Sequence, residues 1–169
     1  MTNVATVLVA DDERDLRRIV RRTLESDQLR VMEAEDGEVA LALIERDEPP
    51  LDLVITDLIM PRLGGMEVVE TLRLFRPELP LIVISGWAQS PAGRRMLEEY
   101  EVPVLSKPFT PAQLTTQVRQ ALQETRRGAA TLRRRAQEAG TESTDIRRQT
   151  GELVAAAYRF KERLGATAG

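Results

Sequence analysis

The chain has 169 residues and a net charge of −3, with 30% charged and 42% hydrophobic residues, which suits one domain with an appendage and excludes wholesale disorder. It contains no cysteine and no histidine, which excludes disulfides, thiolate or imidazole metal ligands, a cysteine nucleophile and proton transfer by histidine. The sequence has no apolar run of the roughly 18 residues that cross a membrane and no signal peptide, so we expect a cytoplasmic protein without a membrane role.

The first 124 residues alternate between short apolar runs and amphipathic stretches of helical period. In chain order, we expect a strand at 4–10, a helix at 14–26, a strand at 31–34, a helix at 37–46, a strand at 51–56, a helix at 66–75, a strand at 79–84, a helix at 91–100, a strand at 102–105 and a helix that begins near Pro111. The residues of the second helix that we expect to face inward, or nearly so, are Val39, Leu41, Leu43 and Ile44. Apolar strands that alternate with helices predict an α/β fold with a parallel sheet covered on both faces.

The remainder of the chain has a different composition. Residues 125–169 contain ten basic and five acidic residues and no proline, a net charge of +5, whereas residues 1–124 contain 14 basic and 22 acidic residues, a net charge of −8. This asymmetry predicts two modules: a domain of residues 1–124 and a basic helical extension of residues 125–169. The helix from Pro111 is expected to run to Ala139, followed by a break at Gly140 and a last helix capped by Ser143 or Thr144.

The predicted last helix carries an apolar stripe at the spacing of a coiled-coil seam. Its members are Ile146, Thr150, Leu153, Ala157, Phe160 and Leu164. Because so short a helix is marginal in water without packing, we expect it to pair with its own copy in a homodimer or with a partner helix. The alternative is that it folds back onto the first 124 residues.

Polar residues that suit metal and phosphate chemistry directly follow the predicted strands. They are Asp11 and Asp12, Asp57, Ser85 with Gly86, and Lys107 followed by Pro108. Ligands of a parallel α/β sheet bind beyond the carboxyl ends of the strands, so these side chains are expected to meet at one edge. Three close carboxylates repel one another and need a cation, and without histidine or cysteine they suit Mg²⁺.

Each of these residues also has a purely structural interpretation. Asp12 can be a helix N-cap, Asp57 a turn residue and Lys107 a solvated side chain. The order of the set favours a functional site, because an acid pair, an acid, a hydroxyl and a lysine follow the strands in turn.

With that ordered set, the first 124 residues resemble a bacterial response-regulator receiver domain (CheY-like), the phosphoacceptor module of two-component signalling. Five motifs carry the resemblance: Val7-Leu8-Val9-Ala10-Asp11-Asp12-Glu13, Asp57-Leu58-Ile59-Met60-Pro61, Gly64-Gly65-Met66, Ile84-Ser85-Gly86 and Ser106-Lys107-Pro108-Phe109. The resemblance implies a flavodoxin-like, doubly wound fold with five parallel strands in the order 2-1-3-4-5. It says nothing about residues 125–169.

The resemblance also implies the chemistry of the acidic residues. Asp57 would be the phosphorylation site and would receive its phosphoryl group from a sensor histidine kinase or a phosphotransfer protein. The cofactor would be Mg²⁺, held by Asp11, Asp12, the Asp57 carboxylate and the Ile59 carbonyl.

The remaining motif residues would bind the phosphoryl group or shape its entrance. Lys107 and the Ser85 hydroxyl would each contact a phosphoryl oxygen, Gly86 would leave the entrance open, and the peptide bond before Pro108 would be cis. One position departs from the family, because Val104 stands where a switching aromatic residue is common. Signal transmission by that ring is therefore not expected.

From these features we expect a phosphoacceptor response regulator that signals through protein–protein interaction or dimerisation and turns over no separate substrate. The alternative is a transcription or RNA-binding regulator, because the arginine-rich tail suits nucleic acid. We prefer the interaction hypothesis, since residues 125–169 are short for a helix-turn-helix or winged output domain and contain no second compact core. A third possibility is a phosphate sink that has no output.

Overall fold

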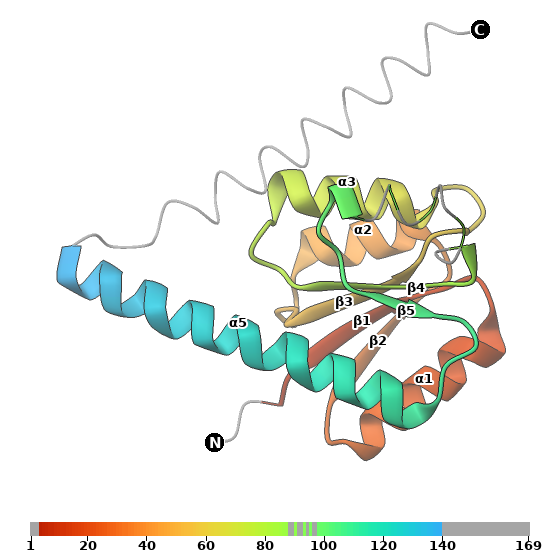
Figure 1. The fold of residues 1–169 in the computed structure, drawn as a ribbon, viewed down its shortest axis with the longest axis horizontal. Helices are drawn as coiled ribbons and strands as arrows, with labels where there is room; N and C mark the ends of the chain where they lie inside the picture. The colour runs from red at the N-terminus through yellow and green to blue at the C-terminus, as the bar shows by residue number, and fades with distance from the viewer. Residues whose placement is uncertain (1–3, 88–89, 91–92, 94, 96–97, 140–169) are drawn as a thin grey trace, which may run out of the picture.

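The computed structural model of the chain describes residues 4–87, 90, 93, 95 and 98–139. Its centre is a sheet of five parallel strands, β1 (Thr6–Ala10), β2 (Arg30–Ala34), β3 (Leu53–Asp57), β4 (Leu81–Ser85) and β5 (Val104–Ser106). The strands lie side by side in the order β2-β1-β3-β4-β5 (Figure 1), which confirms the doubly wound arrangement expected from the sequence.

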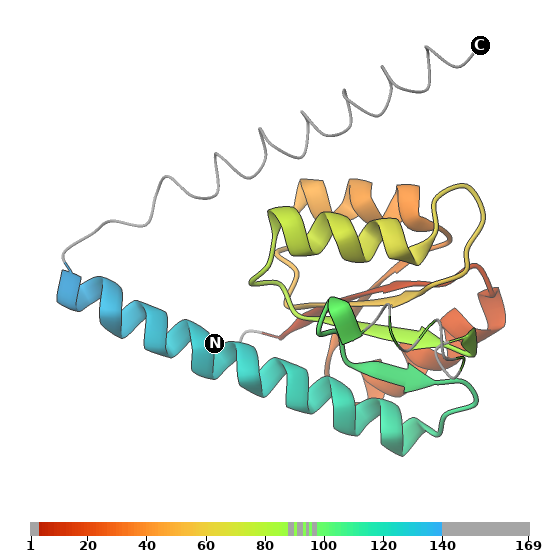
Figure 2. The same ribbon diagram turned by 45° about the horizontal axis from the view of Figure 1, so that its top comes forward.

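Helices cover both faces of this sheet. Helices α1 (Arg14–Ser26) and α5 (Pro111–Ala139) pack on one face, and α2 (Gly37–Arg46) and α3 (Gly65–Phe75) pack on the other (Figures 1 and 2). Successive strand residues point to opposite faces, so β1 places Val7 and Val9 in the core under α1 and α5, and Leu8 and Ala10 in the core under α2 and α3. This burial on two sides explains why Val7, Leu8, Val9 and Ala10 are all apolar.

Helix α2 begins and ends where the sequence predicts, and its first turn shows why. The Oδ1 atom of Asp36 accepts a hydrogen bond from the backbone N–H of Val39 at 2.8 Å and so caps the helix. The buried residues of α2 follow a helical stripe and are Gly37, Ala40, Leu41 and Ile44. Val39 lies off this stripe and is 38% exposed, so the prediction that it faces inward is wrong.

The segment between β4 and β5 is described only in part. Of the residues in the helix predicted at 91–100, the structure describes Gly93, Arg95, Glu98 and Glu99 as helical, and Tyr100 as a turn. The other residues of that prediction lie outside the described part of the chain.

Helix α5 runs unbroken from Pro111 to Ala139, as the sequence predicts, and therefore passes through the boundary predicted between residues 124 and 125. Its first turns pack on the sheet through Leu114, Val118 and Leu122, and its later turns extend beyond the sheet (Figure 1). The last predicted helix, its apolar stripe and the dimer that it implies lie outside the described residues. Among the described helices, none is both long and apolar enough to cross a membrane.

Candidate functional site at the carboxyl edge of the sheet

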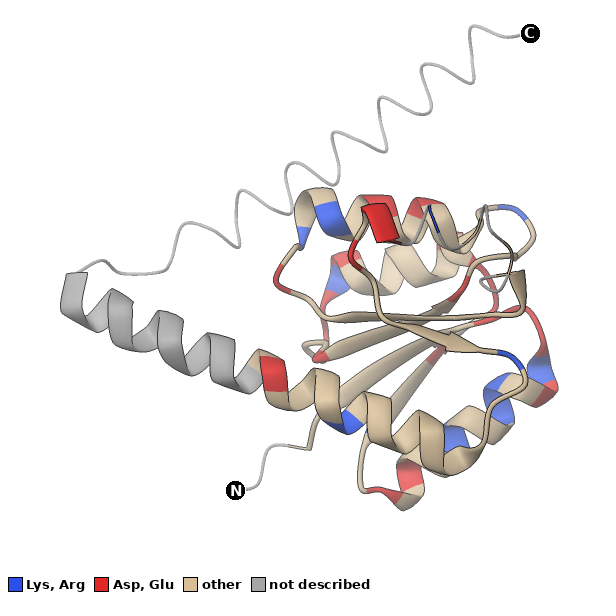
Figure 3. Ribbon diagram, in the orientation of Figure 1, with Lys and Arg blue, Asp and Glu red and all other residues tan. Residues whose placement is uncertain are grey.

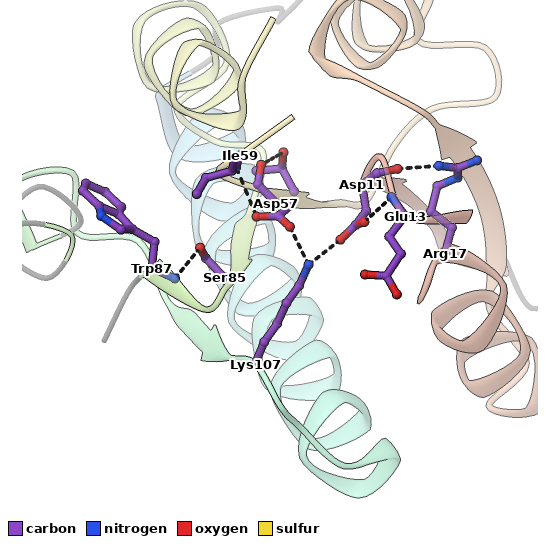
Figure 4. A network of polar contacts seen from close by, with 9 residues as sticks. Asp11, Glu13, Arg17, Asp57, Ile59, Ser85, Trp87 and Lys107 are labelled. Carbon is purple, nitrogen blue, oxygen red and sulfur yellow. Dashed lines mark hydrogen bonds and ion pairs between the residues drawn. The ribbon is translucent and has the colours of Figure 1, made fainter. Parts of the chain in front are cut away.

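The polar residues singled out in the sequence come together at the carboxyl edge of the sheet. Asp11 and Asp12 follow β1, Asp57 is the last residue of β3, Ser85 is the last residue of β4, and Lys107 follows β5. Because all five strands are parallel, their carboxyl ends share one edge, and the side chains of Asp11, Asp57 and Lys107 point toward one another there (Figure 4).

Three carboxylates form the acidic part of this site. One ligand atom from each of Asp11, Asp12 and Asp57 lies within 4.8 Å of the other two. Asp11 and Asp57 are buried, whereas Asp12 is exposed to solvent. A cluster that offers only oxygen ligands and opens to water on one side fits Mg²⁺, which binds one or two carboxylates and retains several waters. The residues present therefore fit the expected ion.

Lys107 connects two of these carboxylates. Its Nζ donates a hydrogen bond to Oδ2 of Asp11 at 2.9 Å and a second one to Oδ2 of Asp57. Burial raises the pKa of the Asp11 carboxyl, and the hydrogen bond from Lys107 offsets only part of that effect. Burial by itself lowers the pKa of Lys107, but the hydrogen bonds to Asp57 and Asp11 outweigh it, and the pKa of the ammonium group is raised. Lys107 is therefore a stable cation between two acids.

The loop after β3 keeps close contact with Asp57. The backbone N–H of Ile59 donates to Oδ1 of Asp57 at 3.2 Å, while the Ile59 residue is 65% exposed. The loop closes where the backbone N–H of Gly65 donates to the carbonyl of Leu58 at 2.9 Å. A Cβ atom at Gly65 would lie 1.7 Å from the carbonyl oxygen of Asp57, so glycine is required for this approach.

The hydroxyl residue lies beside the acidic cluster. Ser85 is buried, and its Oγ accepts a hydrogen bond from the backbone N–H of Trp87 at 3.2 Å. The indole ring of Trp87 points away from Asp57 (Figure 4). Gly86 is exposed, and a Cβ atom there would meet nothing within 4 Å, so the backbone after β4 is open to an approaching ligand.

Two further expectations from the sequence concern the peptide bond before Pro108 and the residue at position 104. The peptide bond between Lys107 and Pro108 is cis. Val104, at the position where an aromatic residue is common in the family, begins β5, is partly buried against the core under α2 and α3, and accepts a hydrogen bond from Gln117 at its carbonyl.

Sequence reasoning missed two arginines at the loops of the site. Arg17 on α1 donates a hydrogen bond to the carbonyl of Asp11, and Arg62 in the loop after β3 pairs with the buried Asp36. No local sequence pattern indicates which cation would pair with Asp36. Arg17 was one of five arginines on α1, a helix whose positive charge is visible in Figure 3.

The chain is similar in sequence to response regulators and to part of a sensor kinase. The family described as the response regulator receiver domain matches residues 7–119. The response regulator MprA of Mycolicibacterium vanbaalenii is 37% identical over 121 residues, which are 70% of this chain and 51% of that protein. The sensor kinase CckA of Brucella abortus is 32% identical over 124 residues, 73% of this chain and 13% of that protein. The chain thus spans about half or less of the length of these curated relatives.

Solved structures share the same fold. A receiver domain protein (CheY-like) from Methanospirillum hungatei superposes with a TM-score of 0.69 at 23% identity, over 75% of this chain and 99% of that one, a likeness of fold alone. The receiver domain of the hybrid histidine kinase CckA gives a TM-score of 0.58 at 31% identity, over 70% of this chain and 99% of that one.

Proposed function

This chain belongs to the response regulator receiver family of two-component systems, and we propose that it is a phosphoacceptor whose Asp57 receives a phosphoryl group from a histidine kinase or a phosphotransfer protein. The observation that carries the proposal is the buried Asp57 carboxylate, which lies beside Asp11 and Asp12 and pairs with Lys107. The likeness to the receiver domain of a hybrid histidine kinase supports a phosphodonor of this class.

In the proposed reaction, a carboxylate oxygen of Asp57 attacks the phosphorus atom of a phosphohistidine. The new P–O bond forms as the P–N bond breaks, and the imidazole leaves with the electron pair of that bond. Lys107 moves its pairing from the Asp57 carboxylate to a phosphoryl oxygen, and the Ser85 hydroxyl donates to another. The result is an acyl phosphate at the edge of the sheet.

The charge of the donor requires a cation in addition to Lys107. Asp11, Asp12, the Asp57 carboxylate and the carbonyl of Ile59 would hold Mg²⁺, which when bound neutralises part of the negative charge on the phosphoryl oxygens. The arginines of α1, which begins at Arg14, outnumber the acids of that helix, and the excess of positive charge attracts an anionic donor. They are Arg14, Arg17, Arg18, Arg21 and Arg22.

Phosphorylation with a small-molecule donor tests the role of Asp57 directly. The wild-type chain, incubated with acetyl phosphate and Mg²⁺, is expected to gain the mass of one phosphoryl group, and Asp57→Asn is expected to gain none. Asp52→Asn is a matched control, since Asp52 lies at the opposite end of the sheet, where it accepts a hydrogen bond from the backbone N–H of Thr6 at 2.8 Å. An Asp57→Asn protein that is phosphorylated as readily as the wild type would contradict the assignment of Asp57 as the phosphorylation site.

The metal site has its own test in Asp12→Asn. Asp12 is exposed, so this change removes a carboxylate without disturbing the core. We expect weaker Mg²⁺ binding by calorimetry and slower phosphorylation at a fixed Mg²⁺ concentration. Asp15→Asn, which alters an exposed acid on α1 that is paired with Arg18, is expected to leave both unchanged. Equal Mg²⁺ affinity in Asp12→Asn and the wild type would contradict the ligand set.

For the output, we propose protein–protein interaction or dimerisation through the extension of residues 125–169, with no turnover of a separate substrate. The support is the seam-like spacing of Leu153, Ala157 and Phe160 in the sequence. Light scattering of the full chain should give a dimer, and Leu153→Asp combined with Phe160→Asp should give a monomer. Arg148→Asp, which adds negative charge off the seam, should remain dimeric. A monomeric wild type would exclude self-pairing.

The alternative output, nucleic-acid binding, is supported by the net charge of +5 on residues 125–169. A DNA or RNA titration at low and at high salt tests it, because contacts with phosphate groups produce a steep loss of affinity with salt. Absence of salt-dependent binding would remove this alternative.

A further inference from the structure

We propose that Arg17 and Arg62 are positioning residues that fasten the two loops of the acidic site to the edge strand β2 and the loop after it. The inference rests on the proposed metal and phosphoryl site and concerns how that site keeps its shape. Arg17 contacts the loop after β1, Arg62 is part of the loop after β3, and each pairs with an acid from residues 33–36. Strand β2 and the loop after it, which supply none of the proposed ligands, therefore hold both site loops.

Arg17 fastens the loop after β1. Its Nη1 donates a hydrogen bond to the carbonyl of Asp11 at 2.5 Å, and its Nε lies 3.7 Å from Oε1 of Glu33 on β2. The side chain of Arg17 is only 13% exposed, so the contact is largely shielded from water. The backbone N–H of Asp11 also donates to the carbonyl of Ala34 at 3.2 Å. The peptide units on both sides of the Asp11 Cα are therefore tied to β2, directly or through Arg17.

Arg62 fastens the loop after β3. Its Nε donates to Oδ2 of Asp36, and its Nη2 donates to Oε1 of Glu35 at 3.1 Å. The Asp36 side chain is 1% exposed, and its other oxygen caps α2. The neighbouring backbone repeats the link, since the N–H of Gly37 donates to the carbonyl of Leu63 at 2.9 Å. A charged side chain and the main chain thus hold the same loop.

The fastened loop carries the backbone groups that face Asp57. Ile59 lies three residues before Arg62, and its N–H donates to the Asp57 carboxylate at 3.2 Å. Mg²⁺ requires near-ideal octahedral geometry, so a loop that drifts loses affinity even when every ligand is still present. Residues that hold ligands in place typically contribute about 10–100-fold to metal affinity.

The acids that pair with the two arginines also reduce the positive charge near the cation site. An unpaired guanidinium near the site would repel a divalent cation, but Arg62 pairs with both Glu35 and Asp36, and Arg17 lies 3.7 Å from Glu33, which also pairs with Arg21 at 2.8 Å. Arg62 can therefore orient its loop without adding net positive charge at the cation site, and the charge of Arg17 is compensated in part.

Calorimetric Mg²⁺ titration of the full chain, together with urea unfolding, tests the inference. Arg62→Met and Arg17→Met are each expected to weaken Mg²⁺ binding by about tenfold. Arg62→Met also leaves a buried carboxylate unpaired and lowers stability, so the double variant with Asp36→Asn separates the two effects. Asparagine keeps the helix cap, and the double variant should recover stability while its Mg²⁺ affinity stays low.

Arg76→Met is the matched control. Arg76 also joins two acids, with Nε donating to Glu78 at 2.7 Å and Nη2 lying 3.7 Å from Asp47, but it lies at the far end of α3 from the site loop. The Arg76→Met variant should be less stable than the wild type but bind Mg²⁺ with unchanged affinity. Mg²⁺ affinities of Arg62→Met and Arg17→Met within about twofold of the wild type would overturn the inference. A wild type that binds no Mg²⁺ would overturn the proposed metal site as well, and the two failures are distinguishable.

Discussion

Asp11 and Lys107 are separated by 96 residues, yet the Lys107 Nζ lies 2.9 Å from the Asp11 Oδ2 and donates a hydrogen bond to it. The same ammonium group pairs with Asp57, so a single lysine contacts two buried carboxylates and neutralises part of their charge. The lysine is therefore part of what keeps the acidic edge stable, in addition to its proposed contact with a phosphoryl oxygen.

Replacing this lysine should destabilise the metal-free protein. Lys107→Met leaves Asp11 and Asp57 facing each other, and we expect the free energy of unfolding to fall by about 1–3 kcal/mol, the cost of leaving a buried acceptor without its partner. Mg²⁺ should then bind more tightly than in the wild type, because the ammonium group no longer competes for the carboxylates. Urea unfolding and calorimetry measure the two effects. A variant with unchanged stability and weaker Mg²⁺ binding would contradict this account.

Replacement by alanine should affect stability strongly at one glycine of the site, Gly65, and hardly at all at another, Gly86. In Gly65→Ala the new Cβ would collide with the Asp57 carbonyl oxygen, because a Cβ with ideal geometry at residue 65 lies only 1.7 Å from that oxygen. We expect a loss of about 1–3 kcal/mol or more, which exceeds the roughly 0.5–1 kcal/mol that alanine gains over glycine in a helix. Gly86→Ala should change stability by less than about 0.5 kcal/mol, since its Cβ meets nothing within 4 Å. If urea unfolding gave Gly65→Ala and Gly86→Ala the same stability, the close approach of Gly65 to the Asp57 carbonyl would be contradicted.

Trp87 should report the state of Ser85. The backbone N–H of Trp87 donates to the Ser85 hydroxyl at 3.2 Å, and the Trp87 residue is 37% exposed. If the hydroxyl turns toward a phosphoryl mimic, this hydrogen bond breaks, and the fluorescence of Trp87 should change when Mg²⁺ and beryllofluoride are added. Asp57→Asn should abolish the change, and Ser85→Ala should reduce it. An undiminished response in Ser85→Ala would show that the signal does not pass through this hydrogen bond.

The contact between α1 and α5 predicts a specific pH dependence. Arg119 on α5 donates from its Nε to Oδ2 of Asp27 at 2.8 Å, and this hydrogen bond lowers the pKa of the Asp27 carboxyl. A carboxyl whose pKa is lower in the folded than in the unfolded chain stabilises the fold above its unfolded pKa of about 3.9, and the stabilisation is lost as pH falls through the folded pKa. Arg119→Met removes this contribution.

The stability difference between the wild type and Arg119→Met should therefore be constant from about pH 7 to pH 5 and shrink below about pH 4. Urea unfolding over this range measures it. The matched control is Arg22→Met, an exposed arginine of α1, which should show no such shrinkage. A difference that persists at acidic pH would mean that Arg119 acts through packing rather than through Asp27.

Local sequence patterns were sufficient to predict most of the fold and which residues lie together at the carboxyl edge of the sheet. The bounds of α1 and α2 agree with the predicted 14–26 and 37–46, because helical period is a property of a few neighbouring residues. The strand ends identified Asp11, Asp57 and Lys107, since the parallel order of the strands brings their carboxyl ends to one edge whatever the intervening sequence.

The pairing of charges, by contrast, was decided only by the tertiary structure. Among the many arginines of the chain, nothing local distinguishes Arg62, which meets the buried Asp36, or Arg119, which meets Asp27 from a position 92 residues away. The reason is physical: an apolar period follows from the geometry of one element, whereas the partner of a charge depends on how separate loops and helices are placed around the sheet.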